Sequence, residues 1–413
     1  MMNKTTATDR EKFIWNMLGS LANAFSTLIL SICVNRILGE QSGGIFAFAY
    51  ANAQLLLTVG GFEVRPYQST DIREKYGFST YFTLRLFTCG LMMLFAGCYI
   101  FWGDFSGTKR WLILLLAAFK CVEAFTDVFA GRFQQKDRID LSGKIFFIRV
   151  TASTLMFILL IGITGSLVAG AAGMLITSFG LFWLYDLKQF FPEDRKQIRI
   201  QTEGILKLSG EVLPLFIGAF LMMYISNAPK YAIDELYSDE LQNVYNILFM
   251  PAFVINLFSL FVFRPMLVKM AIYWNDRKLK ELWKIIFGMY GLIGGLTALA
   301  AGAAWLIGIP VLELLYGTEL EEYRLQLAAV MMVGGISAFM TFCSNVITVM
   351  RKQRFVLAGY GLTFLYVIFF VRSFVRQNGI NGAILSYGIA VGLLVLIFNV
   401  IMIMASVDQR KKG

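Results

Sequence analysis

Three charged residues stand inside an apolar run of the sequence at the spacing of one helical face. Lys120, Glu123 and Asp127 are three and four residues apart, so a helix brings them together on one side. Arg85 and Arg149 lie in neighbouring apolar runs and could reach that side. A charge at the centre of a membrane-spanning helix costs about 2.5–3.5 kcal/mol, so it normally faces a bundle interior or water. The pattern predicts either a polar binding site or an ion-pair network that holds helices together.

The first apolar run contains a second polar pattern. Small hydrogen-bonding side chains recur there at steps of three and four: Asn16, Ser20, Asn23, Thr27, Ser31 and Asn35. On a helix these residues form one polar stripe. The stripe is expected either to line a cavity, with Asn23 at its middle, or to make hydrogen bonds between packed helices.

Two arginines precede prolines at equivalent positions in the two halves of the chain, Arg65 before Pro66 and Arg264 before Pro265. An arginine at the end of a span commonly anchors the helix at the membrane surface. The symmetric placement favours a second role, because a guanidinium binds phosphate in a bidentate manner. Both residues are candidates for binding an anionic head group.

A further pair of basic residues ends the first helix of each half. Arg36 closes the first run, and Lys230 follows Asn227 and Pro229 at the matching position. These residues are expected to form a phosphate site on the outer side of the membrane, or to extend their charged ends to the surface.

Composition identifies the class of protein that must position these side chains. Of 413 residues, 57% are hydrophobic and 15% are charged, with a mean hydropathy of +0.65. A spanning helix needs about 20 apolar residues, so the chain is predicted to be an all-α integral membrane protein with twelve transmembrane helices. The expected spans are 14–37, 43–64, 79–103, 110–131, 145–163, 166–187, 209–229, 242–263, 284–309, 326–350, 355–375 and 380–405.

These spans divide into two equal groups. We expect an N-terminal six-helix lobe (1–187), a cytoplasmic linker (188–208) and a C-terminal six-helix lobe (209–413), related by a pseudo-two-fold axis along the membrane normal because six spans separate the matching motifs. If the N-terminus is cytoplasmic, 27 of the 37 Lys and Arg residues lie on the cytoplasmic side. The positive-inside rule therefore predicts that both ends are cytoplasmic. The net charge of +10 is spread over short loops, which gives no indication of nucleic-acid binding.

The sequence lacks the usual signatures of catalysis. It contains no histidine, and its five cysteines lie in apolar runs without metal-ligand spacing. No Walker A loop, dinucleotide fingerprint or nucleophile elbow is present. We therefore expect no enzyme activity, no cofactor and no metal site, and energy coupling from ion, voltage or substrate gradients.

Several motifs resemble a known family. The stretch Arg36-Ile37-Leu38-Gly39-Glu40 and the ending Gly60-Gly61-Phe62-Glu63-Val64-Arg65 resemble the opening of bacterial polysaccharide transporters, the flippases of O-antigen and teichoic-acid type. Asn227-Ala228-Pro229-Lys230 and the segment 249–256, which ends at Asn256, look like a Gram-positive branch of that group. The resemblance covers most of the chain and adds Asn256 to the candidate binding residues.

The resemblance implies membership of the multidrug/oligosaccharidyl-lipid/polysaccharide (MOP) exporter superfamily. It implies two lobes that alternate in access around a cationic cavity, in a monomer of the bacterial plasma membrane. The implied partners are a polyprenyl-diphosphate-linked oligosaccharide, the bilayer and glycosyltransferases or a polymerase of the same pathway.

On this hypothesis Arg65, Arg264, Arg85 and Lys120 bind the diphosphate, and the polar stripe binds the sugars. One alternative is a multidrug antiporter of the same fold, whose cavity is expected to be apolar or acidic. Another is a membrane glycosyltransferase or polymer ligase, for which the outer loops are short.

Overall fold

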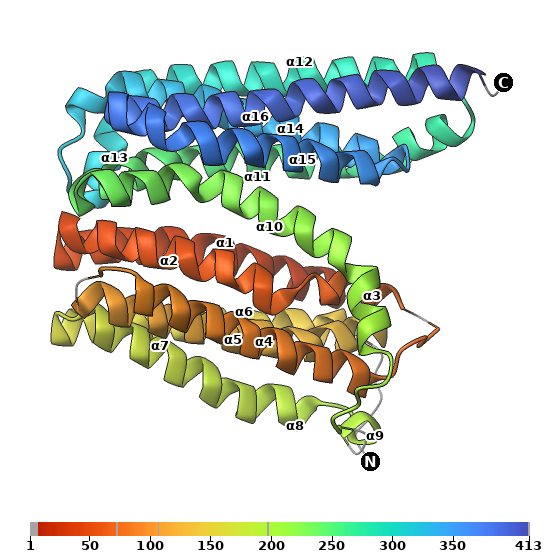
Figure 1. Cartoon of the computed structure of the whole chain (residues 1–413), viewed down its shortest axis with the longest axis horizontal. Coiled ribbons are helices and arrows are strands. Elements are labelled where there is room, and N and C mark those ends of the chain that lie inside the picture. Colours follow the sequence, from red (N-terminus) through yellow and green to blue (C-terminus); the bar gives the residue numbers. More distant parts are fainter. Residues whose placement is uncertain (1–6, 72, 106, 196–197, 412–413) are drawn as a thin grey trace. The chain divides into compact units, whose positions relative to one another are not determined.

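The computed structural model describes residues 7–71, 73–105, 107–195 and 198–411, apart from the side chains of 193, 253–254, 256–265, 268 and 411. No strand occurs in these residues. The long helices of the first half are α1 (Asp9–Leu38), α2 (Glu40–Gly61), α4 (Phe78–Trp102), α5 (Gly107–Gln135), α6 (Ile139–Thr164) and α7 (Leu167–Leu181), which continues through the π-helical η1 (Phe182–Asp186) into α8 (Leu187–Gln189). The short helices α3 (Val64–Thr70) and α9 (Pro192–Arg195) lie at their ends (Figure 1).

The second half repeats this series of long helices. It comprises α10 (Ile205–Leu236), α11 (Asp239–Asn275), α12 (Leu279–Ala303) with η2 (Ala304–Gly308) and α13 (Ile309–Tyr316), the single 3-10 turn η3 (Glu321–Tyr323), α14 (Arg324–Val349), α15 (Gln353–Tyr366) with η4 (Val367–Val371), and α16 (Arg372–Lys411). Gly379 interrupts α16 with a backbone that is not helical, φ 53° and ψ −129°. This break separates the eleventh long segment from the twelfth.

The helices have the length and composition of membrane spans. Among the described residues, nine helical stretches are long and apolar enough to cross a bilayer, and the last of them, Gln353–Arg410, contains the two segments on either side of Gly379. The two other long helices are α5, which carries the charged face of Lys120, and α11. The chain is a multi-pass membrane protein, and the predicted all-helical fold is confirmed.

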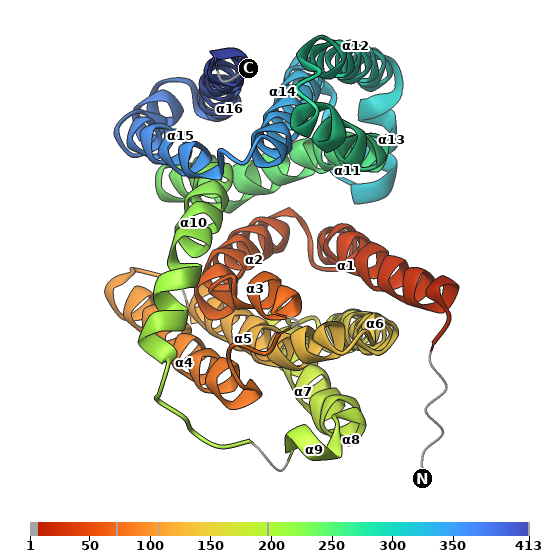
Figure 2. The same ribbon diagram turned by 90° about the vertical axis from the view of Figure 1, so that its right-hand side faces the viewer.

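Two compact units divide the chain, residues 1–223 and 224–413, and the division falls inside α10. In unit 1 the fourth long helix, α5, lies among α2, α4, α6 and α7 (Figure 2). In unit 2 the fourth long helix, α14, is in contact with α11, α12, α15 and α16. Each unit therefore buries the equivalent helix at its centre. The lobe boundaries expected at 187 and 209 stay predictions.

Helices α1 and α6 pack at very short range through two glycines. A Cβ atom on Gly143 would lie 2.5 Å from the carbonyl carbon of Trp15, and one on Gly19 would lie 2.9 Å from the Gly143 oxygen. Backbone cannot yield as a flexible side chain does, so any larger residue at 143 would push the helices apart. This contact directs one face of α1 toward α6 and leaves the polar stripe on a neighbouring face.

The end of α2 is the most irregular part of unit 1. Phe62 and Glu63 both adopt left-handed backbone conformations, with φ of 46° and 51°, which is uncommon for residues other than glycine. The Phe62 ring stacks on Phe216 of α10 at 4.3 Å between centroids. The turn reverses into α3 and so brings Arg65 against α5.

A group of ion pairs holds the loop between α3 and α4. Arg132 at the end of α5 lies 2.6 Å from Asp194, and its guanidinium also contacts Glu74. Lys136 donates a hydrogen bond to Glu74 and holds the pKa of that carboxyl below its ordinary value. The loop is thus fixed to α5 by charge.

Candidate functional site

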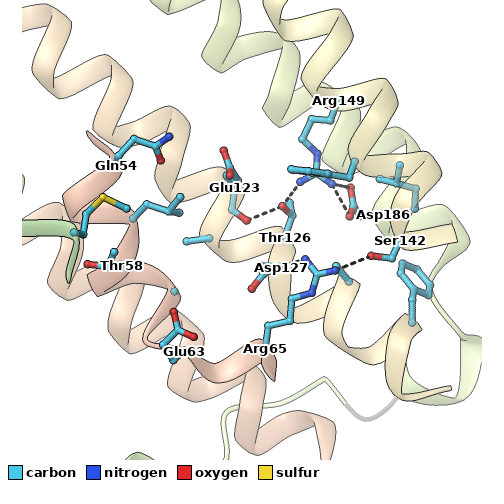
Figure 3. A pocket seen from close by; sticks show the side chains of 18 residues that line it. Gln54, Thr58, Glu63, Arg65, Glu123, Thr126, Asp127, Ser142, Arg149 and Asp186 are labelled. Atoms are coloured by element: carbon cyan, nitrogen blue, oxygen red, sulfur yellow. Dashed lines mark hydrogen bonds and ion pairs between the residues drawn. The ribbon is translucent and has the colours of Figure 1, made fainter. Parts of the chain in front are cut away.

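A cavity of about 260 Å³ lies within unit 1, between α2, α3, α5 and α6 (Figure 3). Its lining contains neutral polar groups such as Gln54 and Thr58 beside charged ones. The charged lining residues are Glu63, Arg65, Glu123, Asp127, Arg149 and Asp186. The cavity therefore brings together charges from four separate stretches of the chain.

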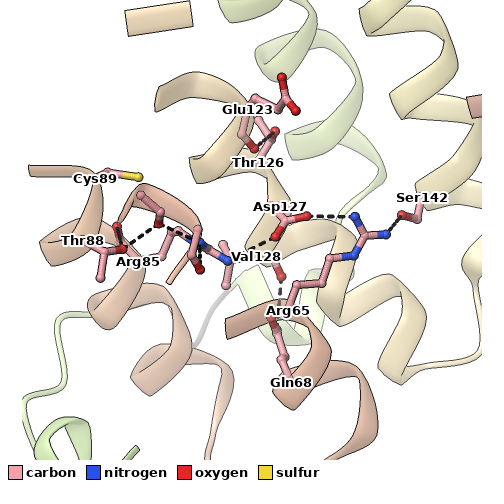
Figure 4. Close-up of polar contacts among 12 residues, drawn as sticks. Arg65, Gln68, Arg85, Thr88, Cys89, Glu123, Thr126, Asp127, Val128 and Ser142 are labelled. Carbon is pink, nitrogen blue, oxygen red and sulfur yellow. Dashed lines mark hydrogen bonds and ion pairs between the residues drawn. The ribbon is translucent and has the colours of Figure 1, made fainter. Parts of the chain in front are cut away.

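Asp127 lies between two guanidinium groups (Figure 4). Its Oδ1 accepts a hydrogen bond from Arg65 Nη1 at 2.8 Å, and its Oδ2 accepts one from Arg85 Nη2 at 3.2 Å. Arg65 also donates to the hydroxyl of Ser142 on α6 at 3.3 Å. One carboxylate on α5 thus joins α3, α4 and, through Arg65, α6.

Arg85 is fully buried and also terminates α2. Its Nη1 donates to the carbonyl oxygen of Gly60 at 2.7 Å and to that of Gly61. The last carbonyls of a helix lack partners within the helix and carry partial negative charge, so a guanidinium there is stabilising. Arg85 therefore has a structural role at the C-terminus of α2, and its Nε has no hydrogen bond to any described residue.

Lys120 is almost completely buried on α5. Its Nζ lies 2.7 Å from Glu123 Oε2, and it sits 5.3 Å from the centre of the Tyr50 ring on α2. The ammonium is therefore held by a carboxylate on its own helix and by an aromatic face.

Arg149 on α6 is paired with Asp186 in η1. Both oxygens of Asp186 accept from Arg149 Nη2, at 2.8 and 2.6 Å, and Arg149 Nη1 donates to Thr126 of α5. Both charged side chains are buried. This pair joins the π-helical segment after α7 to the centre of the unit.

Charges in this cluster balance. The four bases Arg65, Arg85, Lys120 and Arg149 each have a carboxylate partner. Against them stand Asp127, Glu123, Asp186 and Glu63. Glu63 lines the cavity, and no described residue makes a hydrogen bond or ion pair with its side chain (Figure 3). The cluster thus has no surplus of positive charge to offer an anion.

The structure brings six of the predicted residues together and places four others, Asn23, Arg36, Asn227 and Lys230, elsewhere. Arg65, Arg85, Lys120, Glu123, Asp127 and Arg149 belong to this cluster. Asn23 lies half-buried in α1, and Arg36 is exposed at the end of that helix. Asn227 and Lys230 lie in the part of α10 that belongs to unit 2. The side chains of Asn256 and Arg264 lie outside the described residues.

Sequence reasoning missed two acidic residues of the cavity, Glu63 and Asp186. Both lie inside spans that the sequence predicts, 43–64 and 166–187. The cost of an intramembrane charge applies equally to acids, so these two positions carried the same signal as Arg85 and Arg149. Thr126 and Ser142 gave no such signal, because neutral hydroxyls are common in packed helices.

A second cavity, of about 430 Å³, lies in unit 2 beside η2. Its lining is apolar and includes Pro251, Ala300 and Leu327, and it contains none of the predicted site residues. In the part of the chain that the structure describes, no group of three or more His, Cys, Asp or Glu residues is arranged to hold a metal ion.

Together these features define a polytopic, all-helical membrane protein with a polar cavity, beside a charge-balanced cluster, inside one of its units. No protein-family model matches the chain, and no curated protein matches its sequence.

Solved structures match it over nearly its whole length, and they are transporters. An inward-facing multidrug resistance MATE family transporter of the MOP superfamily has a TM-score of 0.70 at 13% identity, covering 98% of this chain and 100% of the other. An outward-facing MATE transporter of the same superfamily gives 0.61 at 11% identity, with coverage of 98% and 96%. The Vibrio cholerae MATE transporter VcmN in the bent form gives 0.57 at 13% identity, with 97% of each chain covered. The chain has the fold of MATE transporters.

Proposed function

We propose that the chain is an alternating-access flippase that moves a polyprenyl-diphosphate-linked oligosaccharide across the membrane. The fold shared with MATE transporters supports membrane transport by alternating access. The motifs that resemble polysaccharide transporters support the lipid-linked cargo. The single observation that carries the proposal is that amide side chains in the first half of the polar stripe on α1 lack hydrogen-bond partners among the described residues.

The stripe presents hydrogen-bonding groups that neighbouring helices do not use. Asn16 is exposed and Asn23 is half-buried, and their side-chain amides have no hydrogen-bond partner among the described residues. Ser20, between them, donates only to the backbone oxygen of Asn16. Toward the other end of α1 the stripe does make contacts, because Thr27 meets the Tyr50 hydroxyl at 3.2 Å. Only the first half of the stripe is open to a ligand.

The opposite side of α1 has the character of a lipid-facing surface. Phe25 and Ile29 are exposed there, and at 100° per residue they lie across the helix from Asn23. Amides that faced hydrocarbon without partners would each cost several kcal/mol. The stripe is therefore expected to face a polar path, and neutral amides suit the hydroxyl groups of a sugar.

A specific observation also favours a second candidate, the export of organic cations. Four carboxylates line the cavity of unit 1 against two guanidinium groups, and Glu63 has no ion-pair partner in the part of the chain that the structure describes. A cation could pair with Glu63 there. Under this alternative the cargo site is the cavity itself, and the stripe is only part of its entrance.

Transport by purified full-length protein in proteoliposomes tests both candidates. The first probe is a fluorescent polyprenyl-diphosphate N-acetylglucosamine, whose transfer between leaflets is measured by quenching from outside; the second is ethidium. We expect transfer of the lipid probe, reduced about tenfold or more in the variant with Asn16→Leu and Asn23→Leu, because each lost hydrogen bond contributes about 0.5–1.5 kcal/mol. Phe25→Leu, on the lipid-facing side of the same helix, is the matched control.

Ethidium movement that Glu63→Gln abolishes, without transfer of the lipid probe, would refute the flippase in favour of the cation exporter. Equal transfer by the double variant and by Phe25→Leu would refute the role of the stripe.

A further inference from the structure

Lys230 differs from the four bases of the unit 1 cluster because its hydrogen-bond partner is a neutral amide rather than a carboxylate. Its Nζ donates to the amide oxygen of Asn246 on α11 at 3.0 Å, and no ion pair joins it to a carboxylate in the described part of the chain. Asp234, one turn further along α10, has contacts of its own. In unit 1, by contrast, Arg65, Arg85, Lys120 and Arg149 all have carboxylate partners.

The surroundings make this arrangement costly without a ligand. Lys230 is half-buried, and α10 around it contributes the buried residues Ile225, Ala228 and Ile233. An ammonium that loses water without gaining a negative partner destabilises the fold. An intramembrane base of this kind commonly marks a substrate or ion pathway.

Gln242 supplies a second, independent observation. Its side chain is fully buried, and neither its amide oxygen nor its amide nitrogen has a hydrogen-bond partner among the residues that the structure describes. It lies on α11 one turn before Asn246, so the two amides share a face of that helix. Each buried amide group left without a partner costs about 1–3 kcal/mol, which a ligand that accepts hydrogen bonds would recover.

We propose that Lys230, Gln242 and Asn246 form a binding site in unit 2 for the phosphoryl oxygens of an anionic cargo. Lysine is a common point-charge partner of phosphate, and the amide nitrogen of Gln242 can donate to a remaining oxygen. The existence of the site rests on these contacts alone. Its assignment to a lipid diphosphate rests on the proposed function.

Binding by the purified full-length protein in lipid nanodiscs tests the site with three probes: farnesyl diphosphate, inorganic pyrophosphate and farnesol. Lys230→Met should weaken farnesyl diphosphate binding about 10- to 100-fold, the effect of one charge-assisted hydrogen bond, and should leave farnesol binding unchanged. Lys278→Met is the matched control, because Lys278 is an exposed lysine of the same unit paired with Asp276. Pyrophosphate binding that is equally sensitive to Lys230→Met would show that the site takes the free anion as well as the lipid.

Thermal stability without ligand distinguishes a binding role of these residues from a purely structural one, because the two roles predict opposite changes in melting temperature. Because Lys230 and Gln242 are under-satisfied, Lys230→Met and Gln242→Met should melt at or above the temperature of the unsubstituted protein when no ligand is present. A lower melting temperature for both variants, or farnesyl diphosphate binding that Lys230→Met leaves within twofold of the Lys278→Met control, would overturn the proposal. If farnesyl diphosphate binds through Lys230 but no lipid probe is transferred, the flippase proposal fails and the site stands.

Discussion

Replacing Asp127 by asparagine should destabilise unit 1 strongly, because one carboxylate serves two guanidinium groups. Asp127→Asn keeps the shape of the side chain and removes its charge. Arg85 would then be a fully buried cation whose remaining partners are the Gly60 and Gly61 carbonyls. Breaking a buried pair by removing one partner costs about 3–5 kcal/mol.

Two features of the structure set the expected magnitude. The Asp127 side chain is 26% exposed and Arg85 keeps its carbonyl partners, so the lower end of that range applies to this pair. The Arg65 side chain is 34% exposed, so the loss of its ion pair with Asp127 adds about 0–1 kcal/mol to the destabilisation. The expected total is about 3 kcal/mol. At about 2–4 °C per kcal/mol for a unit of 223 residues, the melting temperature should fall by about 6–12 °C.

Thermal unfolding of the purified protein in one detergent measures this effect. Asp137→Asn is the matched control, because the Asp137 side chain is 83% exposed and pairs with Lys12 of α1 rather than with a buried cation. That substitution should cost less than about 1 kcal/mol. A double-mutant cycle with Arg85→Met isolates the pair, and we expect a coupling energy above about 1 kcal/mol. A melting temperature for Asp127→Asn equal to that of Asp137→Asn, or additive effects in the cycle, would show that the ion pair does not hold these helices.

Two further predictions concern packing and pH. Gly143→Ala should lower the free energy of unfolding by about 1–3 kcal/mol, because the added Cβ would meet the Trp15 backbone. The control Gly97→Ala, at an exposed helical position with open space around it, should be neutral or stabilising. A melting curve for each variant measures the difference, and equal effects would refute the close α1–α6 contact. Lys136 holds the pKa of Glu74 below its ordinary value of 4.5. The stability that this ion pair contributes is therefore present above pH 4.5 and is lost as pH falls through the lower pKa of the folded state. Glu74→Gln should flatten the fall in melting temperature below pH 4.5, and a fall of unchanged steepness would refute the role of this pair.

The positions of the helices could be predicted well because the bilayer sets their length. The expected spans 110–131 and 326–350 fall on α5 and α14, since about 20 apolar residues between polar breaks define a span whatever it packs against. The ends were less predictable. The expected span 43–64 stops as a helix at Gly61, where Phe62 and Glu63 turn left-handed. Neither Phe nor Glu favours a left-handed backbone, so the sequence does not predict this turn, which tertiary contacts such as the Phe62–Phe216 stack stabilise.

The π-helical segments had no signal in the sequence. Phe182–Asp186, Ala304–Gly308 and Val367–Val371 each occur inside a span and contain ordinary apolar residues. A π-turn adds one residue to the hydrogen-bonded ring without requiring a particular side chain. The first of them ends at Asp186, the partner of Arg149, so the irregular backbone places a charge that regular helical periodicity would have directed elsewhere.

The internal repeat extends to the fold of the units but not to their chemistry. Helices α5 and α14 occupy the same central position with equivalent neighbours. Yet α5 carries Lys120, Glu123 and Asp127, whereas α14 has no charged residue after Arg324 at its start. From the sequence repeat alone, the two members of each equivalent pair were equally good candidates for binding an anion. These pairs are Arg65 with Arg264 and Arg36 with Lys230.

The observed contacts remove that equality for two of these residues. Arg65 is neutralised by Asp127 at 2.8 Å and helps to join α3 to α5 and α6. Among the described residues, Lys230 has a neutral amide partner, Asn246, which lies one helical turn from a buried glutamine whose side-chain amide makes no hydrogen bond. A cation that is already paired must lose its partner before it binds cargo, whereas Lys230 need only gain one. If the cargo is anionic, unit 2 is therefore where it should be held, and the charged cluster of unit 1 is the scaffold that keeps its central helix in place.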